Sequence, residues 1–470
     1  MEPFEQKRKE IIAQLVEERL EQGVSQAELA RRIGTQPSNL CRLESGAQNP
    51  TLDMLLKIAG ALGKDIKLLL ESREEPMNNN CYSLRIYDTE LMRFTMEVRG
   101  LEGLVAEILS VGEETEHLLP LDMQRTGEGI IRWLERRVIP KNRAFVDEIL
   151  KTLGLSANDT KGIIDVCKGL SLNDSYWVVP EGFEGKFAQY NLYENRFSEM
   201  LALVAYTGAG QSRQEFTTSP ELTTNGMLPK AWRLVENDGI YLYKGGTTGA
   251  SNAGREPYCE YYASQIAEAM RLNAVHYDLE NWKGITASKC RLFTNIDTAY
   301  LPIGRLVKSG GIAACLNFYD SFGGAFSEQI RSMLVFDALI YNEDRHFGNF
   351  GVLRDNHSGQ IIAPAPLFDH GLSLFCYAGE EDYAALDAYA KTRSNPYGVS
   401  YESICNQVMG AKQREELRRM IGFRFKRHPS LNLPEEHLAA IENHLQARAR
   451  HLLAIPTRSK AKPAKEKPER

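Results

Sequence analysis

The sequence of 470 residues has no apolar run that approaches the length needed to cross a membrane, and its first residues, MEPFEQKRKE, lack the apolar core of a signal peptide. Its eight cysteines include no C-x-x-C pair, so neither a zinc site nor a disulfide framework is indicated. The net charge of -6 argues against a protein that coats nucleic acid, although a local DNA-binding face is compatible with it. We expect a cytoplasmic protein that does not enter a membrane.

The remaining composition is that of an ordinary globular chain, with 43% hydrophobic and 25% charged residues. At this length we expect two to four domains. The polar stretch SREEPMNNNC at residues 72–81 predicts a linker. The tail 456–470 has a net charge of +4 and three prolines, which predicts a disordered basic segment.

The N-terminal region predicts a bundle of short helices with clear start and stop signals. Ser25, Thr35 and Thr51 are expected to act as N-caps, and Gly34 turns the chain between two short helices, as in a helix-turn-helix. The expected helices span residues 5–22, 26–33, 36–44, 52–62 and 65–70. The segment SQAELARRIGTQPSNLCRLESGAQNPTLDMLLKIAGAL resembles the Cro/repressor-like (XRE) family over its full length.

The XRE resemblance implies that the third helix enters the major groove of an operator DNA. The DNA-binding residues implied are Gln26 on a phosphate, and Gln36, Ser38, Asn39 and Arg42 on base edges. Each of them could instead lie on a merely solvated helix face. Residues 1–75 carry eleven basic and thirteen acidic side chains. Because neutralised phosphates supply most of the affinity for DNA, we expect binding to need a homodimer or basic segments elsewhere in the chain.

The stretch 327–374 carries polar residues that suit phosphoryl transfer. Its apolar pattern predicts a helix from an N-cap at Ser327 to about Asn342, then a polar loop and a hairpin of two strands. Asp344 and Asn349 have the D-x-x-x-x-N spacing of a kinase catalytic loop, and Asp369 stands where kinases keep Asp-Phe-Gly. Because the hairpin brings its ends together, Asn349 and Asp369 are expected side by side, and their oxygens suit Mg²⁺. The alternative is an Asp/Asn-rich loop around a plain hairpin.

The segments NEDRHFGNFG and PLFDHGLSL resemble the HipA-type serine/threonine kinases of bacterial toxin–antitoxin systems, whose patterns are N-x-D-x-H-x-x-N-F and P-x-[FY]-D. The resemblance implies a bilobal kinase-like fold, with Asp344 as the catalytic base and Asn349 and Asp369 as magnesium ligands. His346 matches the family's catalytic-segment histidine and is expected to brace the loop. Asn-Glu-Asp and Asp-His-Gly depart from the His-Arg-Asp and Asp-Phe-Gly of eukaryotic-type kinases.

Residues 216–244 predict a strand, a small-residue loop, a second strand, a tight turn at 237–239 and a strand that ends in Lys244. A kinase builds its phosphate lid and its ATP-binding lysine in this order. A lysine at a strand end is, by itself, usually only solvated. The glycine-rich run 245–254 lacks G-K-[ST] and is expected to be a flexible connection.

The segment GMLPKA, which begins at Gly226, also resembles the G-x-x-P-K-A segment of HipA-like proteins. The nucleotide-binding residues implied are Thr224, Asn225, Gly226, Lys230, Lys244 and Glu260. Glu260, on a predicted helix 257–272, would pair with Lys244, or would only complement the helix dipole. A serine of this loop can be self-phosphorylated in the family, so Thr223 or Thr224 is a hypothetical autophosphorylation site.

The expected architecture is multidomain α+β, with an all-α helix-turn-helix bundle followed by a bilobal HipA-like kinase fold. In the accessory region we expect strands within 82–98 and 171–180 and helices at 102–109 and 143–153, and further helices at 412–425 and 435–453. The expected domains are 1–71 (DNA-binding), 72–81 (linker), 82–210 (accessory), 211–310 (kinase N-lobe), 311–455 (helical C-lobe) and 456–470 (tail).

The sequence favours an ATP- and Mg²⁺-dependent serine/threonine protein kinase with a fused DNA-binding domain that represses its own operon. Its partners would be operator DNA, a protein substrate with a Ser or Thr hydroxyl, and a second copy of the chain. The main alternative is a transcriptional regulator whose kinase-like domain only senses nucleotide. A kinase that acts on a small molecule is a third candidate.

Overall fold

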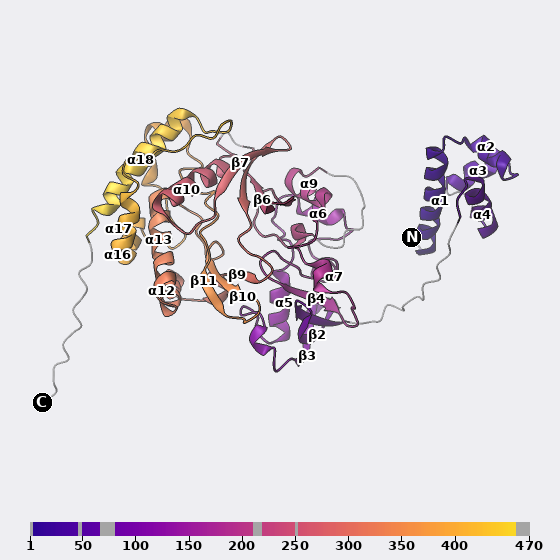
Figure 1. Cartoon of the computed structure of the whole chain (residues 1–470), viewed down its shortest axis with the longest axis horizontal. Coiled ribbons are helices and arrows are strands. Elements are labelled where there is room, and N and C mark those ends of the chain that lie inside the picture. The colour runs from indigo at the N-terminus through magenta and orange to yellow at the C-terminus, as the bar shows by residue number, and fades with distance from the viewer. Residues whose placement is uncertain (1–2, 46–48, 66–79, 210–218, 250–251, 457–470) are drawn as a thin grey trace. The chain divides into compact units, whose positions relative to one another are not determined.

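The computed structural model describes residues 3–45, 49–65, 80–209, 219–249 and 252–456 (Figure 1). The chain separates into two compact units, Met1–Met77 and Asn78–Arg470. No helix among these residues is long and apolar enough to span a membrane. Most of the predicted helix 65–70, of the linker and of the tail lies outside the described residues.

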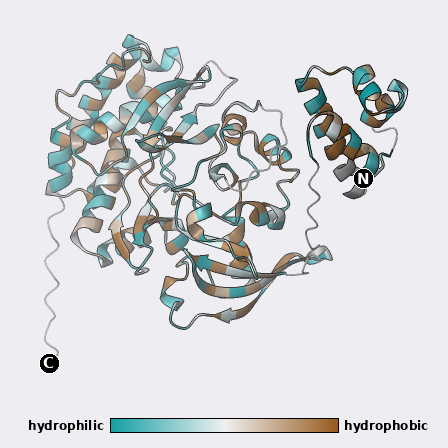
Figure 2. Ribbon diagram, turned by 45° about the vertical axis from the view of Figure 1, so that its right-hand side comes forward, coloured by the Kyte–Doolittle hydropathy of each residue, from teal (hydrophilic) through white to brown (hydrophobic). Residues whose placement is uncertain are grey.

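The first unit is a bundle of the helices α1 (Pro3–Glu21), α2 (Gln26–Arg32), α3 (Pro37–Glu44) and α4 (Leu52–Ala61). Its hydrophobic residues gather where the helices face one another (Figure 2). Ser25 and Thr51 cap α2 and α4 through their side chains, as predicted. The prediction for Thr35 is wrong: Gln36 is the N-cap of α3, because Pro37 lacks an N–H and takes the first helical position.

The second unit begins with an accessory region built on a sheet of order β3-β2-β1-β4. Its strands are β1 (Cys81–Ile86), β2 (Thr89–Arg99), β3 (Gly103–Val111) and β4 (Tyr176–Pro180). The predicted helix 102–109 is wrong, since this segment pairs with β2 along its whole length and edge pairing outweighs its weak helical pattern. The helices here are α5 (Gly127–Glu135), α6 (Val146–Lys151), α7 (Thr160–Cys167), α8 (Phe187–Tyr190) and α9 (Glu199–Thr207).

A second sheet, of order β5-β6-β8-β7, packs against a long buried helix. Its elements are β5 (Lys230–Val235), β6 (Gly239–Gly245), α10 (Glu256–Met270), β7 (Tyr277–Trp282) and β8 (Ile285–Arg291). The predicted strand before the tight turn (β5) and the predicted strand after it (β6) are therefore both present. The strand predicted from residue 216 is not seen in its described part, where Pro220–Leu222 forms a 3-10 turn because Ser219 caps it and Pro220 cannot donate to a ladder.

The last lobe is mainly helical and surrounds α13 (Gly324–Ile340), which is buried along most of its length. A small sheet of order β11-β10-β9 carries the predicted hairpin. The remaining elements are β9 (Thr298–Pro302), α11 (Ile303–Leu306), α12 (Gly311–Ser321), β10 (Gly351–Asp355), β11 (Ile361–Pro364), α14 (Glu380–Ala384), α15 (Leu386–Ala390), α16 (Tyr401–Val408), α17 (Ala411–Arg418) and α18 (Glu435–Leu453).

Two predicted boundaries in this lobe are wrong. Ser327 is not an N-cap, because α13 starts a turn earlier at Gly324 and the Ser327 hydroxyl bonds to Asp320 instead. The helix predicted over 412–425 ends at Arg418, since the chain turns at Gly422 with a positive φ. The order of sheet, long helix, central helix and hairpin is that of the predicted bilobal, kinase-like fold.

Candidate active site

The predicted catalytic loop leaves α13 in a fixed geometry. Tyr341 ends the helix in the left-handed conformation, with φ of 52°. The buried Asn342 then donates from Nδ2 to Asp337 Oδ1 over 2.9 Å and accepts the Asp344 N–H over 3.1 Å. The Asp344 side chain is half-buried, and no group among the described residues donates a hydrogen bond to its carboxylate. That carboxylate is therefore free to accept a hydrogen bond from a substrate.

Asn349 is tied to the same loop. Its Nδ2 donates to the Asp344 carbonyl over 3.0 Å, which leaves the side-chain oxygen Oδ1 without a described donor. His346 is exposed, and its Nδ1 accepts the Gly348 N–H over 3.0 Å. That contact lies within the loop, and the loop-bracing role of His346 stays a prediction.

Arg345, which the sequence reasoning missed, joins the catalytic loop to the segment of Asp369. Its guanidinium is fully buried and forms an ion pair with Asp337, with Nε 3.0 Å from Oδ2. Its Nη1 donates to the carbonyls of both Asn349 (2.9 Å) and Phe368 (2.6 Å). One nitrogen thus holds together the two chain segments that carry the predicted metal ligands.

His370 occupies the middle position of the Asp-His-Gly segment. Its Nδ1 lies 2.9 Å from Arg345 Nη2, so Nδ1 accepts and the ring proton is on Nε2. Burial, together with the charge of Arg345, holds the pKa of His370 well below its usual value. The ring is therefore neutral, and it packs edge-on against Phe336.

Lys244 connects the sheet, the long helix and the Asp369 segment. Its Nζ lies 2.7 Å from Glu260 Oε1 and 2.5 Å from Asp369 Oδ1. Ser288 donates to the second oxygen of Glu260, and the Asp369 N–H donates to the Tyr277 hydroxyl over 3.0 Å. The predicted pairing of Lys244 with Glu260 is present in the structure.

Charge fixes the protonation states of this network. Burial would lower the pKa of Lys244, but the carboxylates of Asp369 and Glu260 outweigh it and raise that pKa. Burial would likewise raise the pKa of Asp369, but Lys244 holds it well below its ordinary value. For Asp344, burial raises the pKa and the opposing charge of His346 only partly offsets it. Lys244 is thus cationic and Asp369 anionic at neutral pH.

The phosphate loop, residues 224–229, connects the turn at Pro220–Leu222 to β5. Gly226 has φ of +94°, and a Cβ there would lie 2.2 Å from Lys230 Nζ. Lys230 is buried and donates to the Asn225 carbonyl over 2.9 Å. Burial and the neighbouring charge of Lys244 lower the pKa of Lys230 to about 7. The amine of Lys230 therefore contacts the loop and titrates near neutral pH.

The two candidate phosphorylation sites are both engaged by the protein. Thr223 is buried, and its hydroxyl donates to the Pro220 carbonyl over 3.3 Å. The Thr224 hydroxyl donates to the same carbonyl over 2.6 Å and accepts the Trp232 Nε1–H over 2.9 Å. Either threonine would have to leave these contacts before phosphorylation.

Most of the predicted DNA-binding residues lie on α3 or just before it. Gln36, Ser38 and Arg42 are exposed. Arg42 Nη2 donates to Asn39 Oδ1 over 3.0 Å. Gln26, at the start of α2, donates to Glu44 Oε2 over 2.7 Å. Gln26 is therefore tied to an acidic partner that a phosphate would have to displace.

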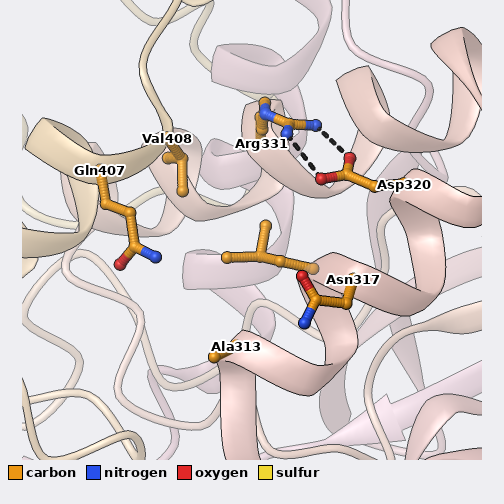
Figure 3. Close-up of a pocket in the computed structure, with 7 residues that line it drawn as sticks. Ala313, Asn317, Asp320, Arg331, Gln407 and Val408 are labelled. Atoms are coloured by element: carbon orange, nitrogen blue, oxygen red, sulfur yellow. Dashed lines mark hydrogen bonds and ion pairs between the residues drawn. The ribbon is translucent and has the colours of Figure 1, made fainter. Parts of the chain in front are cut away.

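A pocket of about 160 Å³ lies elsewhere, between α12, α13 and α16 (Figure 3). Asp320 and Arg331 form a two-point ion pair on its wall, with distances of 2.7 and 2.9 Å. None of the predicted active-site residues lines it. It is also smaller than pockets that hold drug-sized ligands, which are roughly 300 Å³ or more.

Comparison with known proteins identifies the first unit. Residues 15–69 match the family model described as helix-turn-helix. This confirms the predicted helix-turn-helix domain.

Two solved structures share features with the chain at low identity. One is the complex of HipA and HipB, a toxin–antitoxin system of Shewanella oneidensis MR-1, with its operator DNA. The match has 12% sequence identity and a TM-score of 0.46, and it covers 79% of this chain and 97% of the matched chain. The other is CtkA, a proinflammatory kinase of Helicobacter pylori, at 18% identity, 49% and 91% coverage and a TM-score of 0.41. A search of curated proteins found no match. The chemistry of the site is therefore argued from its own geometry.

Proposed function

We propose that the second unit is an ATP- and Mg²⁺-dependent serine/threonine protein kinase of the HipA type and that the first unit binds operator DNA. The observation that carries the kinase proposal is the position of Lys244. It pairs with a glutamate of the long helix, as the ATP lysine of a kinase does. It also contacts Asp369, while the Asp344 carboxylate stays free.

In the proposed reaction, Lys244 and Lys230 neutralise charge on the phosphates of ATP. Asp344 accepts the proton of the substrate hydroxyl while the oxygen of that hydroxyl forms a bond to the γ-phosphorus. The bond from that phosphorus to the bridging oxygen breaks, and ADP leaves. A raised pKa makes Asp344 a stronger base than an exposed aspartate.

Magnesium fits the oxygens that the site presents. Asn349 Oδ1 and Asp369 Oδ2 have no donor among the described residues, and Arg345 fixes the backbones of both segments. Mg²⁺ is usually held by one or two such ligands together with phosphate oxygens and water. Bound there, it would neutralise the charge that develops on the transferred phosphate.

The test is transfer of labelled γ-phosphate from Mg-ATP to the protein itself and to a cell lysate. Wild type, Asp344→Asn and Asp238→Asn, an exposed aspartate of the β5–β6 turn, are compared. The proposal requires label with wild type and with Asp238→Asn but none with Asp344→Asn. No label from any form, despite measurable ATP binding, would favour the regulator that only senses nucleotide.

DNA binding is proposed for the first unit because the exposed start of α3 carries the predicted base-contacting side chains. A gel-shift series over salt concentration with the chain's own promoter region tests it. Specific binding that weakens steeply as salt rises is expected. No sequence-specific complex even at low salt would contradict the proposal.

A further inference from the structure

The proposed reaction uses no residue of the accessory region, yet this region reaches the phosphate loop. Arg143 lies in the segment just before α6, and it is 3% exposed. Its Nη2 lies 2.6 Å from Glu221 Oε2, and both side chains of this ion pair are almost completely buried. Glu221 in turn accepts the Trp232 N–H over 2.8 Å, which fixes the pair to β5.

Arg143 contacts the chain at both ends of the phosphate loop. Its Nη1 donates to the carbonyls of Glu221 (2.7 Å), before the loop, and of Thr224 (3.3 Å), the first residue of the loop. Its Nη2 donates to the Lys230 carbonyl over 2.9 Å, after the loop. A planar guanidinium can serve acceptors in several fixed directions, which an ammonium cannot do.

The carbonyls within the loop are also turned toward protein donors. The Ala144 N–H, next to Arg143, donates to the Met227 carbonyl over 2.8 Å. The Lys230 ammonium donates to the Asn225 carbonyl, and the Gly245 N–H donates to the Pro229 carbonyl over 2.9 Å. By contrast, the N–H groups of residues 225–228 donate to no atom of the part of the chain that the structure describes. Successive backbone N–H groups in a turn can form a concavity that binds an anion.

We propose that Arg143 is a positioning residue for the phosphates of ATP. By holding the carbonyls of Glu221, Thr224 and Lys230 at the two ends of the phosphate loop, it fixes the loop in the shape that leaves the N–H groups of residues 225–228 to bind the anion. The inference rests on the proposed function, because it assumes that ATP is the ligand. It assigns to the accessory region the role of fixing the shape of the nucleotide site.

The test compares Arg143→Lys with Arg137→Lys in the full chain. Arg137 is an equally buried arginine of the same region that forms a two-point ion pair with Asp174 and has no contact with the phosphate loop. Calorimetry measures the Kd of Mg-ATP and of adenosine for each form. Arg143→Lys should weaken Mg-ATP about tenfold or more, because several charged hydrogen bonds are lost, and leave adenosine unchanged. Arg137→Lys should leave both affinities unchanged.

Three results would overturn the inference. In the first, Arg143→Lys keeps the wild-type preference for Mg-ATP over adenosine. In the second, both variants bind Mg-ATP and adenosine equally more weakly, which is the result expected of general destabilisation. A wild type that binds neither ligand would instead remove the proposed function, and the inference with it.

A second measurement needs no variant. Bound Mg-ATP should slow hydrogen exchange at the amides of residues 225–228 in wild type. If Mg-ATP binds and these amides exchange as before, the inference fails even though the proposed function stands.

Discussion

Arg345 offers the sharpest test of how the site is held together. Arg345→Lys keeps the positive charge next to Asp337, so that no buried carboxylate is left unpaired. It removes the nitrogen that donates to the carbonyls of Asn349 and Phe368. A hydrogen bond from a charged group contributes about 1.5–3 kcal/mol, so the loss of this shared contact should lower stability by about 2 kcal/mol or more.

The functional effect should be more specific than the loss of stability. Without the contact of Arg345, the segments of Asn349 and Asp369 separate, and the two proposed magnesium ligands no longer face one ion. We expect phosphoryl transfer to need about tenfold more Mg²⁺, and kcat to fall by roughly one to two orders of magnitude, because small displacements of positioned groups cost about that much. Affinity for adenosine should stay unchanged.

The assay is a Mg²⁺ titration of labelled phosphate transfer, with the folded fraction measured at the same temperature. Arg354→Lys is the control: Arg354 is 1% exposed, and it bonds to the carbonyls of His117 and Leu119 but to neither ligand segment. It should destabilise comparably and leave the Mg²⁺ requirement unchanged. An equal shift of that requirement in both variants, or none in Arg345→Lys, would refute the reasoning.

Three further predictions concern the proposed nucleotide site and the helix α3. Affinity for ATP, but not for adenosine, should fall as pH rises through about 7. Burial and the charge of Lys244 lower the pKa of Lys230 to about 7, so Lys230 loses its positive charge over this range. Calorimetry over pH 6–9 measures the dependence, and Lys230→Met should abolish it. Glu260→Gln should lower kcat/KM about tenfold or more, whereas Glu268→Gln, an exposed change on the same helix, should not. Arg42→Ala should weaken operator binding by about 1–3 kcal/mol in a gel shift, more than Lys57→Ala on α4 does; equal effects would show that α3 does not read bases.

Several features that depend on neighbouring residues could be predicted from the sequence, although the caps at Thr35 and Ser327 could not. The caps Ser25 and Thr51 each act on an N–H three residues later, so their effect is visible in a short window of sequence. The turn before β6 and the hairpin of β10 and β11 follow from local turn residues in the same way. The pairing of Lys244 with Glu260 was implied by the resemblance to HipA-like kinases, and the structure contains it.

Features that depend on distant partners could not be predicted. The segment of β3 reads as a weak helix, and only its pairing with β2 decides its structure. Arg345 contacts the carbonyl of Phe368, and Arg143 contacts carbonyls near residue 224, far along the chain in both cases. A backbone carbonyl has the same chemistry in every residue, so no sequence pattern marks the residue that accepts such a bond.

The accessory region contacts both halves of the proposed site. Arg143 donates to carbonyls at the start of the proposed phosphate loop. Arg354, on the β10–β11 hairpin, donates to carbonyls at residues 117 and 119 and to the hydroxyl of Tyr176. The Tyr300 N–H, on the strand next to that hairpin, donates to the Asn173 carbonyl over 2.7 Å. A hydrogen bond contributes about 0.5–1.5 kcal/mol to stability, and one to a charged group about 1.5–3 kcal/mol, so loss of these bonds would destabilise the lobes that the region contacts. The region therefore belongs to the same compact unit as the proposed site and supports it from both sides.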